Sequence, residues 1–296
     1  MALRITQFSP LPLPTGRSPS DASDIAWRKN EVFLDINQYN TGTAATLIWF
    51  NVILYLSLAL ALKNLTPNVV PWLLITSLAI TLATLPIFYK GLKKPTPLPV
   101  RFNRQRREIC VMRAQDVYWI IPWESVIATA HYTSETARRS GMSLGFLNVR
   151  FDSPHPRERV EKDCHELTFN CPDEEMAASY WEYIRTYMES GPDAVHEPSR
   201  KFTRTKGIFA SYLDDLKEAA KRKGWILTLI WDGFFGLVFF NVLLADYLER
   251  KKLYPLPDLD HPDIIEWSKP LPPEQWARPS AEFQVALAEY EARRVS

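Results

Sequence analysis

The feature that most constrains this chain is a pair of charge-free apolar segments near the N-terminus. Residues 44–62 and 72–89 contain no Asp, Glu, Lys or Arg, and a short connection with two prolines joins them. At about 1.5 Å per residue, a helix of either length approaches the roughly 30 Å thickness of a bilayer's hydrocarbon core. Two adjacent runs of this kind favour a transmembrane helical hairpin over residues 44–89 rather than a buried hairpin in a soluble protein.

Basic residues predict the orientation of this hairpin. They crowd the end of the second segment and occur in the N-terminal region, whereas the connection between the segments has only Lys63. The two clusters are Arg4, Arg17, Arg28 and Lys29 before the hairpin, and Lys90, Lys93, Lys94, Arg101, Arg104, Arg106 and Arg107 after it. Because basic flanks stay in the cytoplasm, we expect a cytoplasmic arm over residues 1–43, flexible over residues 1–23, and a cytoplasmic main domain.

Composition and motifs argue against several classes of function. The net charge of +1 gives no reason to expect nucleic acid, and a mean hydropathy of −0.19 excludes a polytopic transporter. The sequence has no GxSxG, P-loop, GxGxxG or HExxH motif, so we expect no catalytic residues, no cofactor and no enzyme activity. Cys110, Cys164 and Cys171 form no CxxC pair; Cys164, His165 and Cys171 are therefore a poor zinc site, and we predict no metal.

Residues 98–192 show a β pattern followed by one amphipathic helix. The expected strands are short alternating runs at 100–104, 107–113, 116–123, 125–133, 144–151 and 165–171, and the expected helix is 173–190. Trp123 and Trp181 lie on apolar faces of these elements, so we expect both in the core. The order of elements predicts an antiparallel barrel or sheet closed by a C-terminal helix, like a pleckstrin-homology (PH) domain. The fold class is thus an α+β membrane protein.

A third hydrophobic segment follows the β domain. Residues 199–248 contain a basic amphipathic stretch and then the apolar run 225–245, whose one charge, Asp232, is costly near the bilayer centre. We expect a membrane-embedded or re-entrant helix packed on the hairpin, with a full crossing as the alternative. Asn51 and Asp232 each lie seven residues into their segments, so a hydrogen-bonded intramembrane pair is the hypothesis. The proline-rich residues 253–296 predict an extended strap over the domain and a short final helix.

Three motifs carry a family resemblance. RFNRQRREICVMR (Arg101–Arg113), PWE (Pro122–Glu124) and WEYIRTYMESGP (Trp181–Pro192), placed after a two-helix anchor, resemble a bacterial family classed as a domain of unknown function. The resemblance covers roughly residues 24–279. Members tend to be encoded beside type VI secretion effectors and are suspected immunity or accessory proteins. It implies a bacterial inner-membrane, multi-pass location.

The expected function is therefore binding. The resemblance implies an immunity protein that neutralises a type VI secretion effector stoichiometrically, with the effector toxin and membrane lipids as partners, and a homo-oligomer is also allowed. The alternative is a membrane adaptor, for effector loading or lipid sensing, with no toxin partner. One interpretation of the arginine-rich strand is a polar surface for a protein or anionic lipid; the favoured one is juxtamembrane positive-inside charge. The residues concerned are Arg101, Asn103, Arg104, Arg106 and Arg107.

Overall fold

The structure is a computed structural model that describes residues 3–8, 11–37, 41–114, 117–133, 145–154, 164–171, 173–199 and 205–295. The chain divides into two compact units. The β unit comprises Met1–Gln38, Leu98–Ser199 and Asp258–Ser296, and the helical unit comprises Tyr39–Pro97 and Arg200–Pro257. Both units are therefore assembled from segments far apart in the sequence.

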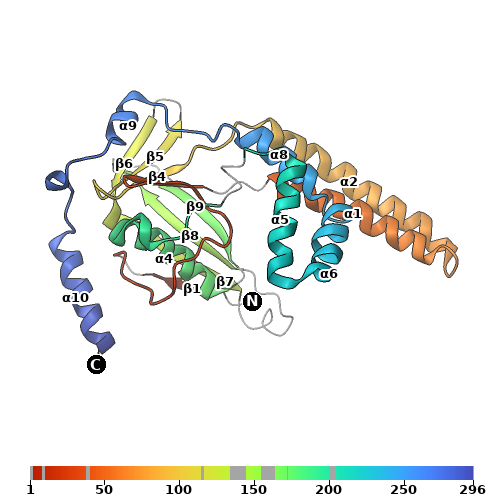
Figure 1. The fold of residues 1–296 in the computed structure, drawn as a ribbon, viewed down its shortest axis with the longest axis horizontal. Helices are drawn as coiled ribbons and strands as arrows, with labels where there is room; N and C mark the ends of the chain where they lie inside the picture. The colour runs from red at the N-terminus through yellow and green to blue at the C-terminus, as the bar shows by residue number, and fades with distance from the viewer. Residues whose placement is uncertain are drawn as a thin grey trace. The chain divides into compact units, whose positions relative to one another are not determined.

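Two antiparallel sheets and one long helix form the β unit (Figure 1). The five-stranded sheet has the order β2 (Ala26–Lys29), β3 (Phe33–Ile36), β4 (Val100–Asn103), β5 (Glu108–Ala114) and β6 (Val117–Pro122). The four-stranded sheet has the order β1 (Leu3–Gln7), β7 (Ile127–Thr133), β8 (Gly145–Asp152) and β9 (Cys164–Cys171). The single-turn helix η2 (Trp123–Ser125) links the sheets, and α4 (Glu174–Ser190) follows β9.

One hydrophobic core lies between the sheets and α4. Alternate strand residues such as Phe102 and Val149 are fully buried, as the period of two in a β-strand requires. Trp123 and Trp181 lie in this core with ring centroids 5.3 Å apart, which confirms the prediction for both side chains. The helix α4 begins at a cap: the Asp173 carboxylate accepts a hydrogen bond from the Met176 amide at 2.8 Å.

The described N-terminal residues up to Asn37 are part of this unit, so the flexible arm expected over residues 1–23 is wrong. β1 pairs with β7, β2 pairs with β3, and β3 pairs with β4. Ile25, Leu34 and Ile36 are completely buried in the core. These strands are short, and prolines and polar turns separate them. Their side chains are buried only because distant strands pair with them, so the local sequence does not reveal the pattern.

Helices make up the second unit. α1 (Thr41–Leu62), η1 (Pro67–Val69) and α2 (Val70–Lys93) form a hairpin. Residues 42–62 and 67–93 are each long and apolar enough to cross a membrane, with only 11% and 6% of their apolar windows buried. After η3 (Pro192–Ala194) of the β unit come α5 (Ile208–Lys223), α6 (Trp225–Thr228), the π-helical η5 (Leu229–Phe235), α7 (Gly236–Val238) and α8 (Val242–Leu253). The stretch from α6 to α8 is bent by 64° at its break.

The tail packs on the five-stranded sheet of the β unit. Leu259 and Ile264, the latter in α9 (Pro262–Trp267), cluster with the buried Cys110 of β5. The chain continues through η6 (Pro273–Gln275), whose following Ala277 amide donates to the Gln105 carbonyl at 2.8 Å. The last helix is α10 (Ala281–Val295), and its Phe283 is buried. The tail thus covers the face of the sheet that points away from the core.

Candidate functional site

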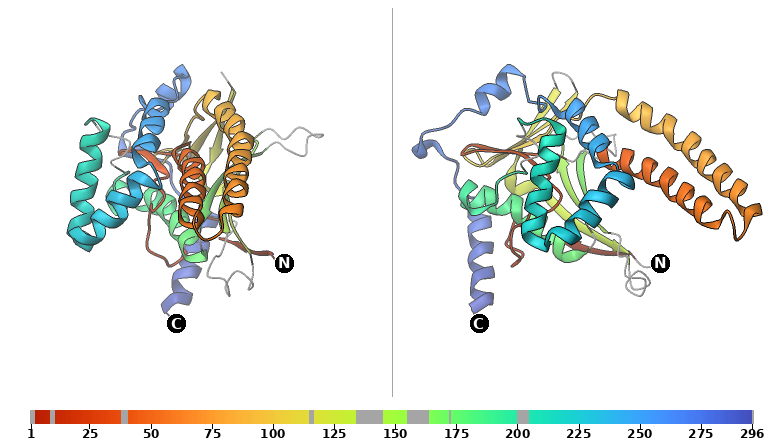
Figure 2. Two further views of the ribbon diagram at one scale, coloured as in Figure 1. Left: turned by 90° about the vertical axis from the view of Figure 1, so that its right-hand side faces the viewer. Right: turned by 45° about the vertical axis from the view of Figure 1, so that its right-hand side comes forward.

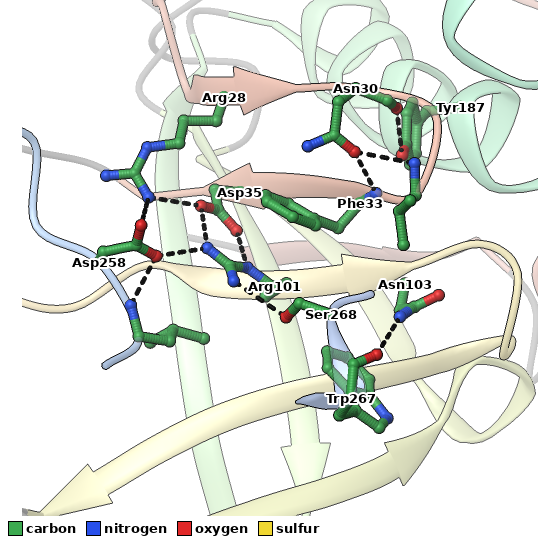
Figure 3. Close-up of polar contacts among 12 residues, drawn as sticks. Arg28, Asn30, Phe33, Asp35, Arg101, Asn103, Tyr187, Asp258, Trp267 and Ser268 are labelled. Atoms are coloured by element: carbon green, nitrogen blue, oxygen red, sulfur yellow. Dashed lines mark hydrogen bonds and ion pairs between the residues drawn. The ribbon is translucent and has the colours of Figure 1, made fainter. Parts of the chain in front are cut away.

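The arginine-rich strand β4 lies at the centre of a buried ion network. Asp35 of β3 and Arg101 of β4 are directly opposite each other in the ladder, so both side chains point to the same face of the sheet. Arg101 donates from Nε and Nη2 to the two Asp35 oxygens at 2.7 and 2.8 Å (Figure 3). Their side chains are 3% and 0% exposed. A bidentate pair of this geometry fixes the position of both groups.

The C-terminal tail completes this network. The Asp258 carboxylate accepts a hydrogen bond from Arg101 Nη2 at 2.7 Å, and its other oxygen lies 2.7 Å from Arg28 Nη1. Arg101 Nη1 also donates to the Ser268 hydroxyl at 3.0 Å. The Arg101 guanidinium lies 3.8 Å from the centre of the Phe33 ring, a cation–π contact. Arg101 therefore joins two strands to two points of the tail, as Figure 3 shows.

Burial and pairing act in opposite directions on these carboxyls. Complete burial raises the pKa of Asp35, although Arg101 and Arg28 oppose the shift. Burial alone would raise the pKa of Asp258 as well, but the hydrogen bond and charge of Arg101 outweigh it and hold that pKa below its usual range. Arg101 stays cationic, because its two acidic partners raise its pKa despite burial.

The remaining polar residues of this strand also bind the tail. Asn103 donates from Nδ2 to the Trp267 carbonyl at 3.0 Å, and Arg106 donates from Nε to the same oxygen at 3.0 Å. The Arg104 guanidinium lies 5.1 Å from the centre of the Trp276 ring. These contacts fasten α9 and the segment after it to the sheet.

Arg107 forms a second, separate network. It has a positive φ of 53° and donates to Glu124 at 2.9 Å and to Glu189 of α4 at 2.9 Å. Glu189 also accepts a hydrogen bond from the Trp123 indole at 2.7 Å. The Ser280 amide, at the start of α10, donates to Glu124 at 3.1 Å. Arg107 thus connects the turn after β4 to α4 and to the end of the tail.

The expected exposed polar surface is therefore wrong for this strand. Arg101 and Asn103 are buried, and Arg104, Arg106 and Arg107 are half-buried with partners in the β unit. The burial and pairing of Arg101 also argue against the favoured interpretation of this residue as juxtamembrane charge. Sequence reasoning missed the acidic partners Asp35 and Asp258. Asp35 stands between Leu34 and Ile36, an alternation that signals a strand with one polar face.

The hypothetical Asn51–Asp232 pair is not formed. Asn51 donates from Nδ2 to the Thr81 hydroxyl of the neighbouring hairpin helix at 3.2 Å. Asp232 lies in the π-helical η5, and its Oδ2 is 2.6 Å from Lys223 Nζ. Equal depth along the two segments did not make them partners, because each side chain is paired with a different residue.

A different face of the β unit is open. On the four-stranded sheet, Ile5 pairs with His131, His131 with Phe146, and Phe146 with Asn170. Their side chains share the face that points away from the core, and the His131 and Phe146 rings stack with centroids 4.8 Å apart. Ile5 is 57% and Phe146 36% exposed. We call these four residues the cross-strand row.

Metal ligation has no support in the part of the chain that the structure describes, where no group of three or more His, Cys, Asp or Glu side chains is suitably placed. Cys110 and Cys171 are buried free thiols, and Cys164 is half-buried. Burial raises the pKa of Cys110 to about 12 and that of Cys171 to about 11. These thiols are protonated at neutral pH and poor metal ligands.

A model of the family of unknown function DUF6708 matches residues 77–251, more than half of the chain. The matched stretch begins inside α2, runs through β4–β9 and α4, and ends in α8. No curated protein matches the chain, and no solved structure does.

Proposed function

We propose that this chain, which belongs to the family of unknown function DUF6708, is a membrane-anchored binding protein. The observation that carries the proposal is the position of the apolar hairpin, which stands between β3 and β4, two strands paired from Phe33–Asn103 to Ile36–Val100. Two chain connections at adjacent strand ends attach the β unit to the anchor. Such an attachment holds a folded binding domain at the bilayer surface.

The strand order supports a PH-like architecture for that domain. β3–β6 follow one another in one sheet, β7–β9 follow in the second, and α4 comes next. This is the order expected of a PH-like barrel closed by its C-terminal helix, with β1 and β2 added. A fold of this type says nothing by itself about the ligand, so the binding surface has to be argued from its residues.

The cross-strand row is the binding surface that we propose. The outer face of the five-stranded sheet is occupied by the chain's own tail, whereas the row on the other sheet exposes Ile5 and Phe146 on either side of the half-buried His131. Exposed aromatic and aliphatic side chains rimmed by polar residues are typical of protein-binding surfaces. The partner class is therefore a protein, bound stoichiometrically.

The specific partner that we propose is an effector toxin of a type VI secretion system, which the protein neutralises as an immunity protein at the bacterial inner membrane. The resemblance of the arginine-rich and Trp181–Pro192 motifs to a family found at such loci supports this choice. The basic residues after α2 support a cytoplasmic position for the β unit. The mechanism is occlusion of the toxin and involves no catalytic step.

The experiment is affinity purification of the tagged protein from membranes of its native host in mild detergent, followed by mass spectrometry. A stoichiometric secreted-effector polypeptide that is lost in Phe146→Asp and retained in Arg150→Ala is the expected result. Arg150 is the matched control, since it is exposed on the same strand and pairs only locally with Asp152. Recovery of secretion-apparatus subunits, or of the protein alone, contradicts the immunity role and leaves the adaptor role.

One observation favours that second candidate, an adaptor or lipid-sensing role. α5 exposes Phe209 and Leu213 and carries Lys221, Arg222 and Lys223 in its last turn. An apolar stripe beside a basic cluster is suited to a membrane surface containing anionic lipid. Salt-sensitive binding of the protein to anionic, but not neutral, liposomes distinguishes this role from toxin binding, because surface charges are screened by salt.

A further inference from the structure

The chain leaves the β unit and returns to it around the third hydrophobic segment. Ser199 ends one part of that unit and Asp258 begins the next. Asp258 is held there by ion pairs with Arg28 and Arg101, each at 2.7 Å. A folded β unit lies on one side of a membrane, so the segment between these two residues starts and finishes on the same side. A single crossing by α6–α8 is incompatible with this connectivity.

Hydrogen bonds join the two ends of the segment directly. Arg250, near the end of α8, donates from Nη2 to the Ser211 hydroxyl at 2.9 Å and from Nη1 to the Lys206 carbonyl at 2.5 Å. Lys206 and Ser211 lie before and within the first turn of α5. We call residues 206–250 the excursion. Hydrogen bonds hold its first and last residues side by side.

That junction lies at the end of the hairpin where both hairpin helices join the β unit. Lys252 Nζ donates to the Lys94 carbonyl at 3.0 Å, and the Thr96 hydroxyl donates to the Lys252 carbonyl at 3.1 Å. Lys94 directly follows α2, at the basic flank of that helix. The excursion thus begins and ends at the level of one membrane surface, the surface nearest the β unit in the chain.

The contacts of the excursion with α1 fix how deep it reaches. The Trp49 indole donates to the Val238 carbonyl at 2.8 Å, and the Phe50 and Phe240 rings stack with centroids 5.6 Å apart. Trp49 is eight residues after Thr41, so these contacts lie roughly 12 Å along the helix at about 1.5 Å per residue. That depth is less than half of a hydrocarbon core of roughly 30 Å.

The chain bends sharply where α7 meets α8. Asn241 has a left-handed φ of 45°, and its side-chain oxygen accepts a hydrogen bond from the Leu244 amide at 3.3 Å as the cap of α8. The helix axis bends by 64° between residues 225–238 and 242–253. At the other end of α6, Gly224 with φ of 84° turns the chain out of α5, which runs crosswise to the hairpin (Figures 1 and 2).

The outward side chains of α6, η5 and α7 are apolar. Those more than half exposed are Trp225, Ile226, Leu229, Trp231 and Phe234. Such a surface needs an apolar environment, and the neighbouring hairpin places it beside a bilayer. The charged Asp232 is paired with Lys223, and its backbone carbonyl accepts a hydrogen bond from the Tyr212 hydroxyl at 2.8 Å. Asp232 therefore binds α5, whereas the apolar side chains of α6, η5 and α7 point outward.

We infer that α5–α8 is a re-entrant element that inserts into only the leaflet on the side of the β unit and returns to that side. Its binding partner is the acyl-chain region of that leaflet, with α5 lying along the membrane surface. The C-terminal tail then occupies the same side as the β unit. The inference does not depend on any protein partner.

Cysteine labelling of the full-length protein in sealed membrane vesicles of both orientations tests this inference, in a cysteine-free background that carries Cys110→Ala, Cys164→Ser and Cys171→Ala. A membrane-impermeant maleimide is applied to single-cysteine variants of exposed residues in different parts of the chain. These are Arg150→Cys for the β unit, Asn68→Cys for the hairpin connection, Val285→Cys for the tail, Phe234→Cys for the excursion and Lys217→Cys for α5. Labelling after denaturation in detergent shows that each thiol is present.

The expected result is that Val285→Cys, Lys217→Cys and Arg150→Cys react from one side and Asn68→Cys from the other. Phe234→Cys resists labelling from both sides until the membrane is dissolved. Reaction of Val285→Cys from the side of Asn68→Cys would overturn the inference, because it requires a crossing. Reaction of Phe234→Cys as fast as Lys217→Cys in intact vesicles also overturns it, and Leu229→Cys repeats this arm if Phe234→Cys fails to fold.

Discussion

Asn37 donates a hydrogen bond from its buried side-chain amide to the carbonyl oxygen of Leu98 at 2.9 Å. The two residues flank the apolar hairpin, and the strands that precede and follow them are paired at Ile36 and Val100. The hairpin consequently occupies the place of a turn between neighbouring strands. The hydrogen bond closes the base of this insertion.

Asn37→Ala should lower the free energy of unfolding of the β unit by about 1 kcal/mol, the usual net contribution of a neutral hydrogen bond. The Leu98 carbonyl loses its partner, and the base of the insertion becomes looser. Thermal unfolding of the full-length protein in detergent measures the change, with the exposed Asn170→Ala as control. Equal effects of the two substitutions would mean that the base is not held by this amide.

Arg101→Met should destabilise the β unit by about 3–5 kcal/mol, because the buried Asp35 carboxylate loses both hydrogen bonds of its bidentate partner. The double variant Asp35→Leu/Arg101→Met should recover much of this loss, since no buried charge is left alone. Chemical unfolding followed by tryptophan fluorescence gives the values. Arg293→Met, which removes an exposed pair with Glu289, is the control, and its effect should stay below about 1 kcal/mol.

Acid should release the tail through Asp258. Its pKa is held below the usual value of about 3.9, so its ion pairs with Arg28 and Arg101 stabilise the attached tail above that pH. This stabilisation is lost as pH falls through the lowered folded-state pKa. The release is measured as a loss of hydrogen-exchange protection of residues 259–267 as the pH is lowered from 7 to 3.

Asp258→Asn should reduce the protection of this segment already at pH 7 and remove its dependence on the Asp258 titration. Glu266→Gln is the matched control, because Glu266 forms an exposed pair with Lys269 in the same stretch of tail. A wild-type pH profile in Asp258→Asn contradicts the role of this carboxylate.

The three cysteines should fall into two classes of reactivity toward maleimide. Burial raises the pKa of Cys110 to about 12 and of Cys171 to about 11, so neither forms the reactive thiolate at pH 8. Cys164 is only half-buried and should be labelled first. Peptide mass spectrometry of the folded protein is the measurement. Labelling of Cys110 before unfolding would show that the tail segment around Leu259 opens readily.

Asn51 should be energetically coupled to Thr81 and not to Asp232. The first pair shares a hydrogen bond at 3.2 Å between the hairpin helices, worth about 0.6 kcal/mol in membranes, whereas Asp232 pairs with Lys223. Double-mutant cycles with Asn51→Leu, Thr81→Val and Asp232→Leu, read as thermal stability in detergent, separate the two cases. The stability effects of Asn51→Leu and Asp232→Leu should be additive, and those of Asn51→Leu and Thr81→Val should not.

The sequence by itself determined the hairpin, most of the strands between β4 and β9, and the core positions of Trp123 and Trp181. These features depend on local periodicity and on runs of apolar residues, which are visible without any knowledge of distant partners. Residues 42–62 and 67–93 have the length and apolarity that the sequence implied. The amphipathic stripe of α4 likewise needed only its own spacing.

Only the tertiary structure decided what the polar residues do. Arg101 looked like surface charge because its partners, Asp35 and Asp258, are 66 and 157 residues away and its burial requires the tail to cover the sheet. Asp232 and Asn51 found different neighbours, because depth along a helix does not specify which side chain lies closest. The return of the chain to the β unit after α8, on which the proposed re-entrant element rests, likewise follows from contacts that no local pattern encodes.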